Sequence, residues 1–197
     1  MDGTKEWTFE IAIVEHQFQK LMNYFQNMSQ YIIDQKSGVE AGIKNAIDTG
    51  ADSEYYSDDW YIIEILEQQF CHLMIVSIYT LIEKELAKIQ KNIRKTKIDF
   101  DLKKEKSTIF INGIKVIRNI IAHENGELLN TKKKDIDQIK AAFLNNNIHG
   151  FSIKNADSEK MRHRIELNLE FITYCLKKSK EELQNIIQQI KKCKKTK

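Results

Sequence analysis

Apolar residues recur every three or four positions along a stretch in the middle of the chain. They are Ile63, Leu66, Phe70, Met74, Ile78 and Leu81, and the same spacing continues through Glu85 to Ile89. This spacing follows the period of about 3.6 residues of an α-helix, and further apolar residues widen the face between residues 70 and 82. The pattern predicts one long helix over residues 59–93. Its broad apolar face indicates a position at the centre of the fold.

The rest of the chain favours helices as well. It contains no proline and only 7 glycines among 197 residues. Helix interiors exclude proline and disfavour glycine, whereas loop-rich and β-rich folds use both. The expected fold class is therefore all-α. A chain of this length can bury about 70% of its unfolded surface, so a single domain needs neither a disulfide nor a metal ion to fold.

Similar patterns predict four more helices, separated by polar segments. They cover residues 7–34, 107–124, 133–144 and 158–191. Residues 36–60 contain glycine, aspartate and serine, which predicts a loop with room for one helical turn; Ser57 or Asp58 is the expected cap of the central helix. Residues 145–157 predict a turn that can include a short extended piece. The expected architecture is a bundle of four to five main helices.

The cysteines and the N-terminal residues exclude several classes of protein. Cys71, Cys175 and Cys193 lack the close spacing of a zinc site or a disulfide framework. The first residues lack the basic and apolar regions of a signal peptide. No apolar run approaches the roughly 20 residues of a membrane span. We therefore expect a soluble, cytoplasmic protein without metal or cofactor.

Charge is distributed unevenly, although the formal net charge is only +3. Residues 48–67 are acidic, whereas residues 88–106 and the C-terminal end are basic. Basic clusters can contact nucleic-acid phosphates, but on helix ends they are more often solvated surfaces. The candidate RNA-binding residues are Arg94, Lys95, Lys97, Arg162 and Arg164.

Polar residues interrupt the apolar helix that is predicted to end near residue 124. Arg118, Asn119 and His123 fall within six positions, and the following Asn125-Gly126 pair favours a helix end. Asn119 and His123 are four residues apart and share a helix face. Arg118 and His123 are about 140° apart around an ideal helix, so they would not touch directly on a straight helix. They can still flank one groove, because the arginine side chain is long.

These residue types suit phosphodiester chemistry. A histidine in the last helical turn is stabilised in its protonated form by the partial negative charge there, and it can act as acid or base near neutral pH. An arginine can bind a phosphate through two parallel hydrogen bonds. Because no acidic cluster accompanies them, Arg118 and His123 favour a metal-independent reaction over a two-metal one. The structural alternative is a helix-end cluster that pairs with Glu124 or Glu127.

The segment RNIIAH, from Arg118 to His123, resembles the Arg-x(4–6)-His motif of HEPN domains. These domains often carry a polar residue directly after the arginine, as Asn119 does here. The setting is also similar, because the motif ends an apolar helix that follows a long central helix and precedes a long C-terminal helix. The resemblance covers residues 60–191 and implies a HEPN-like bundle, with the helix at residues 7–34 packed on it, in a single domain over residues 1–197.

The resemblance implies an activity. HEPN proteins usually dimerise and place two such motifs in one cleft, and many are metal-independent endoribonucleases of toxin–antitoxin, abortive-infection, phage-defence or CRISPR systems. His123 would assist attack by the ribose 2′-OH or protonate the leaving 5′ oxygen, Arg118 would hold the phosphate, and Asn119 would orient either of them. The implied partners are an RNA substrate, a second copy of the chain and an antitoxin or another defence-system protein.

One difference from the family pattern qualifies the resemblance. Some HEPN toxins carry a tyrosine two residues after the histidine, which a nucleotidyltransferase modifies, but this chain has Asn125 there. Control by tyrosine adenylylation is therefore not expected.

Two glutamates are candidate supporting residues of the motif. Glu83, at the edge of the central apolar stripe, is a candidate support for Arg118, and it is equally well explained as part of a solvated edge. Glu124, next to His123, is the second candidate supporting residue.

Two other functions fit the same residues. One is a catalytically inactive HEPN module that dimerises or binds a partner protein. The other is an unrelated helical adaptor in which Arg118 to Gly126 forms a structural helix end. Host toxicity that depends on His123 would separate the enzyme from both.

Overall fold

The computed structural model describes residues 3–101, 108–124, 126–129, 133–144, 148–157 and 162–193. It is a mostly helical bundle, as the sequence predicts, with one small sheet attached. The elements are α1 (Gly3–Thr49), α2 (Tyr55–Thr96), α3 (Thr108–Glu124), β1 (Glu127–Leu129), α4 (Lys133–Ala142), β2 (Phe151–Asp157), β3 (Arg162–Leu167) and α5 (Leu169–Lys192).

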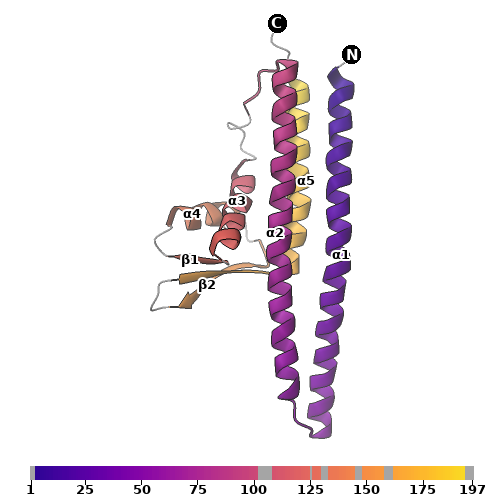
Figure 1. Ribbon diagram of the computed structural model, residues 1–197, viewed down its shortest axis with the longest axis vertical. Helices are drawn as coiled ribbons and strands as arrows, with labels where there is room; N and C mark the ends of the chain where they lie inside the picture. Colours follow the sequence, from indigo (N-terminus) through magenta and orange to yellow (C-terminus); the bar gives the residue numbers. More distant parts are fainter. Residues whose placement is uncertain are drawn as a thin grey trace.

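Three long helices form the body of the molecule. α1 and α2 make an antiparallel hairpin, α5 packs against both of them, and α3, α4 and the sheet lie on the other side of α2 from α1 (Figure 1). One hydrophobic core extends from Trp7 in α1 to Ile190 in α5. The predicted central position of α2 is confirmed, because Met74, Ile78 and Ile82 along its middle are fully buried.

The loop predicted over residues 36–60 is wrong for most of its length. α1 continues to Thr49, and only a short connection separates it from α2 at Tyr55. Gly38 and Gly42 lie inside the helix, whereas Gly50, with a φ of +67°, follows its end, and a Cβ on Gly42 would be 2.5 Å from the ring of Tyr56. The missing side chain of Gly42 lets the two helices approach closely.

The predicted cap of α2 is also wrong. The capping residue is Glu54, whose own side chain makes no capping hydrogen bond. The hydroxyl of Ser57 instead donates a 2.6 Å hydrogen bond to the carbonyl of Glu54 from within the first turn. Asp58 lies in that first turn as well, where a negative charge is favourable.

The predicted helical start at residue 158 is wrong too. Residues 162–167 form strand β3, and α5 begins only at Leu169, where the Asn168 side chain accepts a 3.0 Å hydrogen bond from the Phe171 amide. The strand has the two-residue alternation of a half-buried strand, since Ile165 and Leu167 are buried while Arg164 is exposed. The extended piece expected near residue 151 is the partner strand β2.

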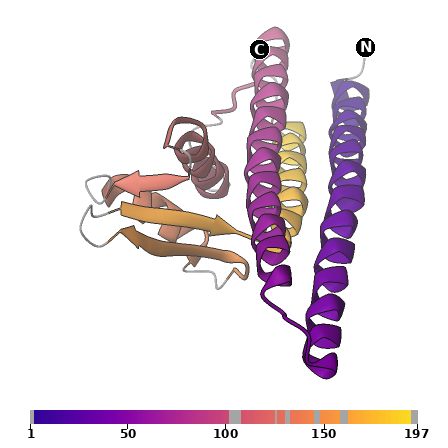
Figure 2. The same ribbon diagram turned by 60° about the horizontal axis from the view of Figure 1, so that its bottom comes forward.

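The sheet is antiparallel, with strand order β1-β3-β2. β3 pairs with β1 through Glu127 opposite Arg164, and with β2 through Ile153 opposite Ile165. The whole sheet projects to one side of α2, below α3 in Figure 2. The chain therefore leaves the end of α3 directly into the sheet.

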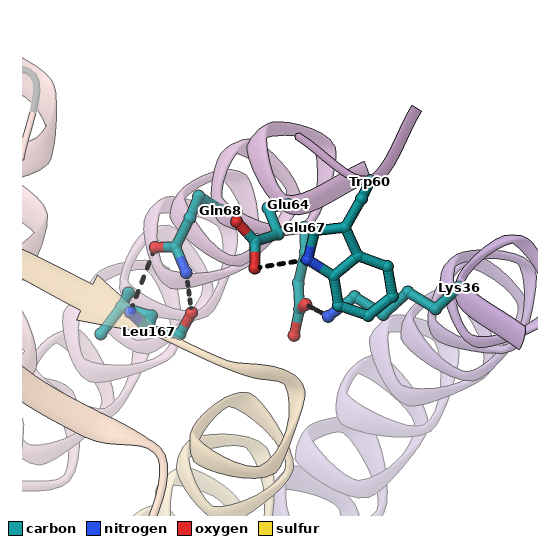
Figure 3. A network of polar contacts seen from close by, with 6 residues as sticks. All are labelled: Lys36, Trp60, Glu64, Glu67, Gln68 and Leu167. Carbon is teal, nitrogen blue, oxygen red and sulfur yellow. Dashed lines mark hydrogen bonds and ion pairs between the residues drawn. The ribbon is translucent and has the colours of Figure 1, made fainter. Parts of the chain in front are cut away.

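Polar side chains of α2 contact both the sheet and α1 (Figure 3). Gln68 donates to the Leu167 carbonyl at 2.5 Å and accepts from the Leu167 amide at 3.2 Å, which holds the end of β3 against α2. Lys36 of α1 forms an ion pair with Glu67, a buried carboxylate. This pair and the hydrogen bonds of Gln68 set the positions of α1 and the sheet around α2.

The sequence predicts no apolar segment long enough to cross a membrane, but one helix of the structure has that length and composition. α2 is long and apolar enough over residues 56–96 to cross a membrane, by length and composition only. A core helix of a soluble protein passes the same test, and α2 packs against α1, α3 and α5.

Candidate functional site

The end of α3 has a special backbone conformation. α3 ends at Glu124, as the sequence predicts, and Gly126 has a φ of +80°. The Gly126 amide donates a 3.3 Å hydrogen bond to the Ile120 carbonyl, which turns the chain out of the helix. The Gly126 carbonyl then accepts a 2.9 Å hydrogen bond from the Ile165 amide of β3. Asn125, the other expected turn residue, lies outside the described residues.

Arg118 faces α2 and is half-buried. Its guanidinium carbon lies over the ring of Tyr79, 5.5 Å from the ring centroid. Its Nη1 donates a 2.8 Å hydrogen bond to Oδ1 of Asn119. Its Nε is buried and has no partner among the described residues. Within the described part of the chain, the guanidinium is thus held by stacking and by one hydrogen bond, and no carboxylate forms an ion pair with it.

Tyr79 receives support from the next turn of α2. Burial raises the pKa of Tyr79 to about 12, and the carboxylate of Glu83 adds to the shift, although the nearby Arg118 charge opposes it. The predicted supporting residue Glu83 therefore lies beside Tyr79, whose ring contacts Arg118, and its support of Arg118 stays a prediction.

Asn119 and His123 share a pocket of about 400 Å³ at the end of α3. Val116 and Ile120 form its apolar wall, and Glu124 and Asp135 add two carboxylates. His123 is exposed, so its imidazole can reach a ligand from solvent. The structure confirms that Asn119 and His123 lie on one face, whereas Arg118 points toward α2. Their link is the hydrogen bond from Arg118 to Asn119.

A second histidine lies close to the same helix end. A Cβ on Gly126 would be 2.9 Å from Cε1 of His72, so the imidazole packs directly against the turn. Burial and the positive charge of Arg164 lower the pKa of His72, while a hydrogen bond to the Ile165 backbone opposes the shift. His72 is therefore a neutral packing residue between α2 and the sheet.

The candidate RNA-binding residues fall into two separate regions. Arg94 and Lys95 are exposed in the last turn of α2, and Lys97 caps that helix with a φ of +53°. Arg94 is fifteen residues beyond Tyr79, which corresponds to about 22 Å along α2. Arg94 therefore lies far from Arg118, which stacks on Tyr79. Arg164 is exposed on β3, close enough to α2 to affect His72. The side chain of Arg162 lies outside the described residues.

Three residues of this region were not predicted from the sequence. Tyr79, His72 and Asp135 come from α2 and α4, and only the tertiary structure brings them to the end of α3. Tyr79 and Glu83 are four residues apart, which could have suggested that they meet on one helix face. Among the described residues, no group of three histidine, cysteine, aspartate or glutamate side chains is arranged to hold a metal ion.

Comparisons with protein-family models, with curated proteins and with solved structures gave no match.

Proposed function

We propose that this protein is a metal-independent endoribonuclease of the HEPN type that acts as a toxin or defence effector. The observation that carries the proposal is the hydrogen bond from Arg118 Nη1 to Asn119 Oδ1. It joins the one arginine of the RNIIAH segment to the pocket that contains His123. The proposed phosphate-binding group and the proposed acid–base group are therefore connected through Asn119 at one helix end.

The arrangement of Arg118 suits a phosphate ligand. Stacking on Tyr79 occupies a face of the guanidinium, and Nη1 donates to Asn119, which leaves Nη2 for a non-bridging oxygen of a phosphate. Glu124 and Asp135 give the His123 pocket negative charge. RNA would thus approach from the Arg118 side, where the positive charge lies.

In the proposed reaction the ribose 2′ oxygen attacks phosphorus while its proton passes to His123, and a bond from phosphorus to the 5′ oxygen breaks. A proton must return to the leaving 5′ oxygen, and His123 of a second copy is suited to supply it. Arg118 stabilises the charge that develops on the phosphate. The products are a 2′,3′-cyclic phosphate and a 5′-OH.

The decisive experiment is cleavage of end-labelled, structured RNA by purified protein in EDTA. Wild type, Arg118→Ala and His123→Ala are compared, with His149→Ala as a control because His149 is an exposed histidine outside the motif. The proposal expects cleavage by wild type and the control only, with cyclic-phosphate ends. Equal cleavage by all four proteins would remove His123 from the mechanism, and a folded but inactive wild type would contradict the enzyme.

A second candidate function is a catalytically silent HEPN module that binds a partner or a second copy. It is favoured by the fact that Arg118 already has two intramolecular partners, Tyr79 and Asn119. Expression in a bacterial host separates the two candidates. Growth arrest by wild type but not by His123→Ala supports the enzyme, whereas equal tolerance of both expressed proteins supports the silent module.

A further inference from the structure

The α1–α2 hairpin extends beyond the rest of the fold. α5 packs against both of its helices, but α5 begins only at Leu169, just after Leu167, which is hydrogen-bonded to Gln68 of α2. The hairpin continues past the start of α5 and past the sheet to the turn between α1 and α2 (Figure 1). We call residues 37–66 the hairpin tip.

A groove of about 530 Å³ lies between α1 and α2 at the hairpin tip. The residues that line it are Ile43, Ile47 and Trp60, which are apolar, and Glu40, Lys44 and Ser57, which are polar. Ile47 is 66% exposed, so the groove leaves apolar surface in contact with water. We call this the tip groove. An apolar groove between two helices is suited to the apolar face of a third helix.

The tip groove lies on the side of the hairpin that α5 occupies farther along. On α2, Trp60 precedes Cys71 by eleven residues, which places the two within about 20° of each other around the helix. Cys71 is fully buried and lies close enough to α5 to raise the pKa of a cysteine there. On α1, Glu40 follows Glu15 by 25 residues, again within about 20°. Glu15 accepts a 2.8 Å hydrogen bond from Gln184 of α5. The tip groove is therefore the open continuation of a groove that α5 fills.

Trp60 is held in position on the α2 side of the tip groove. Its Nε1 donates a 3.0 Å hydrogen bond to Glu64, and the Lys36 ammonium lies 5.8 Å from the centroid of its ring (Figure 3). Lys36 is itself fixed by its ion pair with Glu67. A side chain that is already fixed loses little freedom on binding, and tryptophan is enriched among the residues that contribute most to protein interfaces. Trp60 is therefore suited to anchor a partner.

The hairpin tip is strongly acidic. It contains seven acidic residues and one basic residue, Lys44, which gives it a formal net charge of −6. Glu40 lines the tip groove on α1, and Glu64 is bonded to Trp60 on α2, so carboxylates border both sides. This charge repels RNA and acidic protein segments, and it attracts a basic partner.

We propose that the tip groove binds a basic amphipathic α-helix of a partner protein. The apolar face of that helix packs on Ile47 and Trp60, and its lysine or arginine side chains lie against Glu40 and Glu64. The α1 side of the hairpin tip, residues 37–49, is about 20 Å long, so it accommodates about 13 residues of a helix. The partner helix extends the packing of α1, α2 and α5 to the end of the hairpin.

This site is separate from the candidate ribonuclease site. Trp60 precedes Tyr79 by nineteen residues, which corresponds to about 28 Å along α2. A helix in the tip groove therefore leaves Arg118, which stacks on Tyr79, uncovered. Binding to the tip groove does not depend on the proposed function.

The two tryptophans of the chain allow a direct test by NMR. Trp60 lines the tip groove, whereas Trp7 is buried near the start of α1. The probe is a synthetic helical peptide of about 14 residues, with leucine at every third or fourth position and lysine at the others. One comparison peptide has the same composition in scrambled order, and a second has glutamate in place of lysine. The lysine peptide is expected to shift the indole N–H signal of Trp60 but not that of Trp7. Each comparison peptide is expected to bind about tenfold or more weakly.

Matched variants locate the site. Ile47→Lys and Glu40→Lys are each expected to raise the Kd of the lysine peptide about tenfold or more, because both add a repelling positive charge. The control is Ile62→Lys, since Ile62 is 60% exposed at the hairpin tip but lies about 160° from Trp60 around α2. An unchanged Trp7 signal shows that each variant is folded.

Several results would overturn the proposal. They are an unshifted Trp60 signal, equal binding of either comparison peptide, and equal weakening by Ile62→Lys. A Trp60 signal that shifts with protein concentration alone would also overturn it, because a second copy would then occupy the tip groove. Since the titration contains no RNA, its result is independent of the cleavage assay.

Discussion

The guanidinium of Arg118 stacks on the ring of Tyr79, 5.5 Å from its centroid, and so connects the end of α3 to the middle of α2. The arginine of the candidate site therefore depends on a residue 39 positions earlier in the chain. Tyr79 itself is buried, and the nearby Glu83 carboxylate contributes to the raised pKa of its hydroxyl. Several properties of the protein can be predicted from this contact and from the turn beside it.

Removing the Tyr79 ring should loosen Arg118. Tyr79→Leu is expected to lower the free energy of unfolding by about 1–3 kcal/mol, and Tyr79→Phe by less, because the phenylalanine ring still stacks. A double-mutant cycle with Arg118→Met, measured by urea denaturation, should give a coupling of about 0.5–1 kcal/mol. Zero coupling would mean that the stacking contributes nothing to stability.

Stability should fall in alkali because of Tyr79. Its pKa is raised from the usual value of 10 to about 12, so the folded state holds this proton more tightly than the unfolded state does. The contribution is intact below about pH 10 and is lost as the pH rises toward 12. Denaturation over that pH range checks this, with Tyr79→Phe expected to flatten the pH dependence. An unchanged slope in Tyr79→Phe would assign the effect to other groups.

Protonation of His72 should lower the stability of the fold in acid. Its pKa is lowered, so the unfolded state binds its proton more readily, and the contribution present above about pH 6.5 is lost as the pH falls. Arg164→Gln removes the repelling charge and should raise the pKa of His72, as measured by NMR titration. Lys177→Gln, at an exposed position on α5, should leave it unchanged. If the pKa of His72 is unchanged in Arg164→Gln, the charge of Arg164 is not a cause of the shift.

A side chain at Gly126 should strain the turn after α3. Gly126→Ala is expected to destabilise the fold by about 1–3 kcal/mol, because φ is +80° and the new Cβ would meet His72. Gly38→Ala is the matched control. Gly38 lies inside α1 with nothing within 4 Å of a Cβ, so alanine there should stabilise by about 0.5–1 kcal/mol. Equal effects of the two substitutions in thermal denaturation would contradict the role of the turn.

Local pattern alone accounts for much of this protein. The spacing of Ile63 to Ile89 specifies α2 because a 3.6-residue period leaves one broad face to bury, and the Glu124 end of α3 follows from the glycine after it. The helix face shared by Asn119 and His123 is equally local. These features depend only on residues within a few turns of one another.

Other features required the tertiary structure. Residues 36–49 are polar enough for a loop, yet they are helical because they pack along α2, and residues 162–167 are a strand because β1 and β2 supply hydrogen bonds on both sides. The support of Arg118 by Tyr79, and of Gly126 by His72, joins residues far apart in the chain. Such contacts depend on how helices pack around a common core, and the periodicity of one segment carries no information about the register of another.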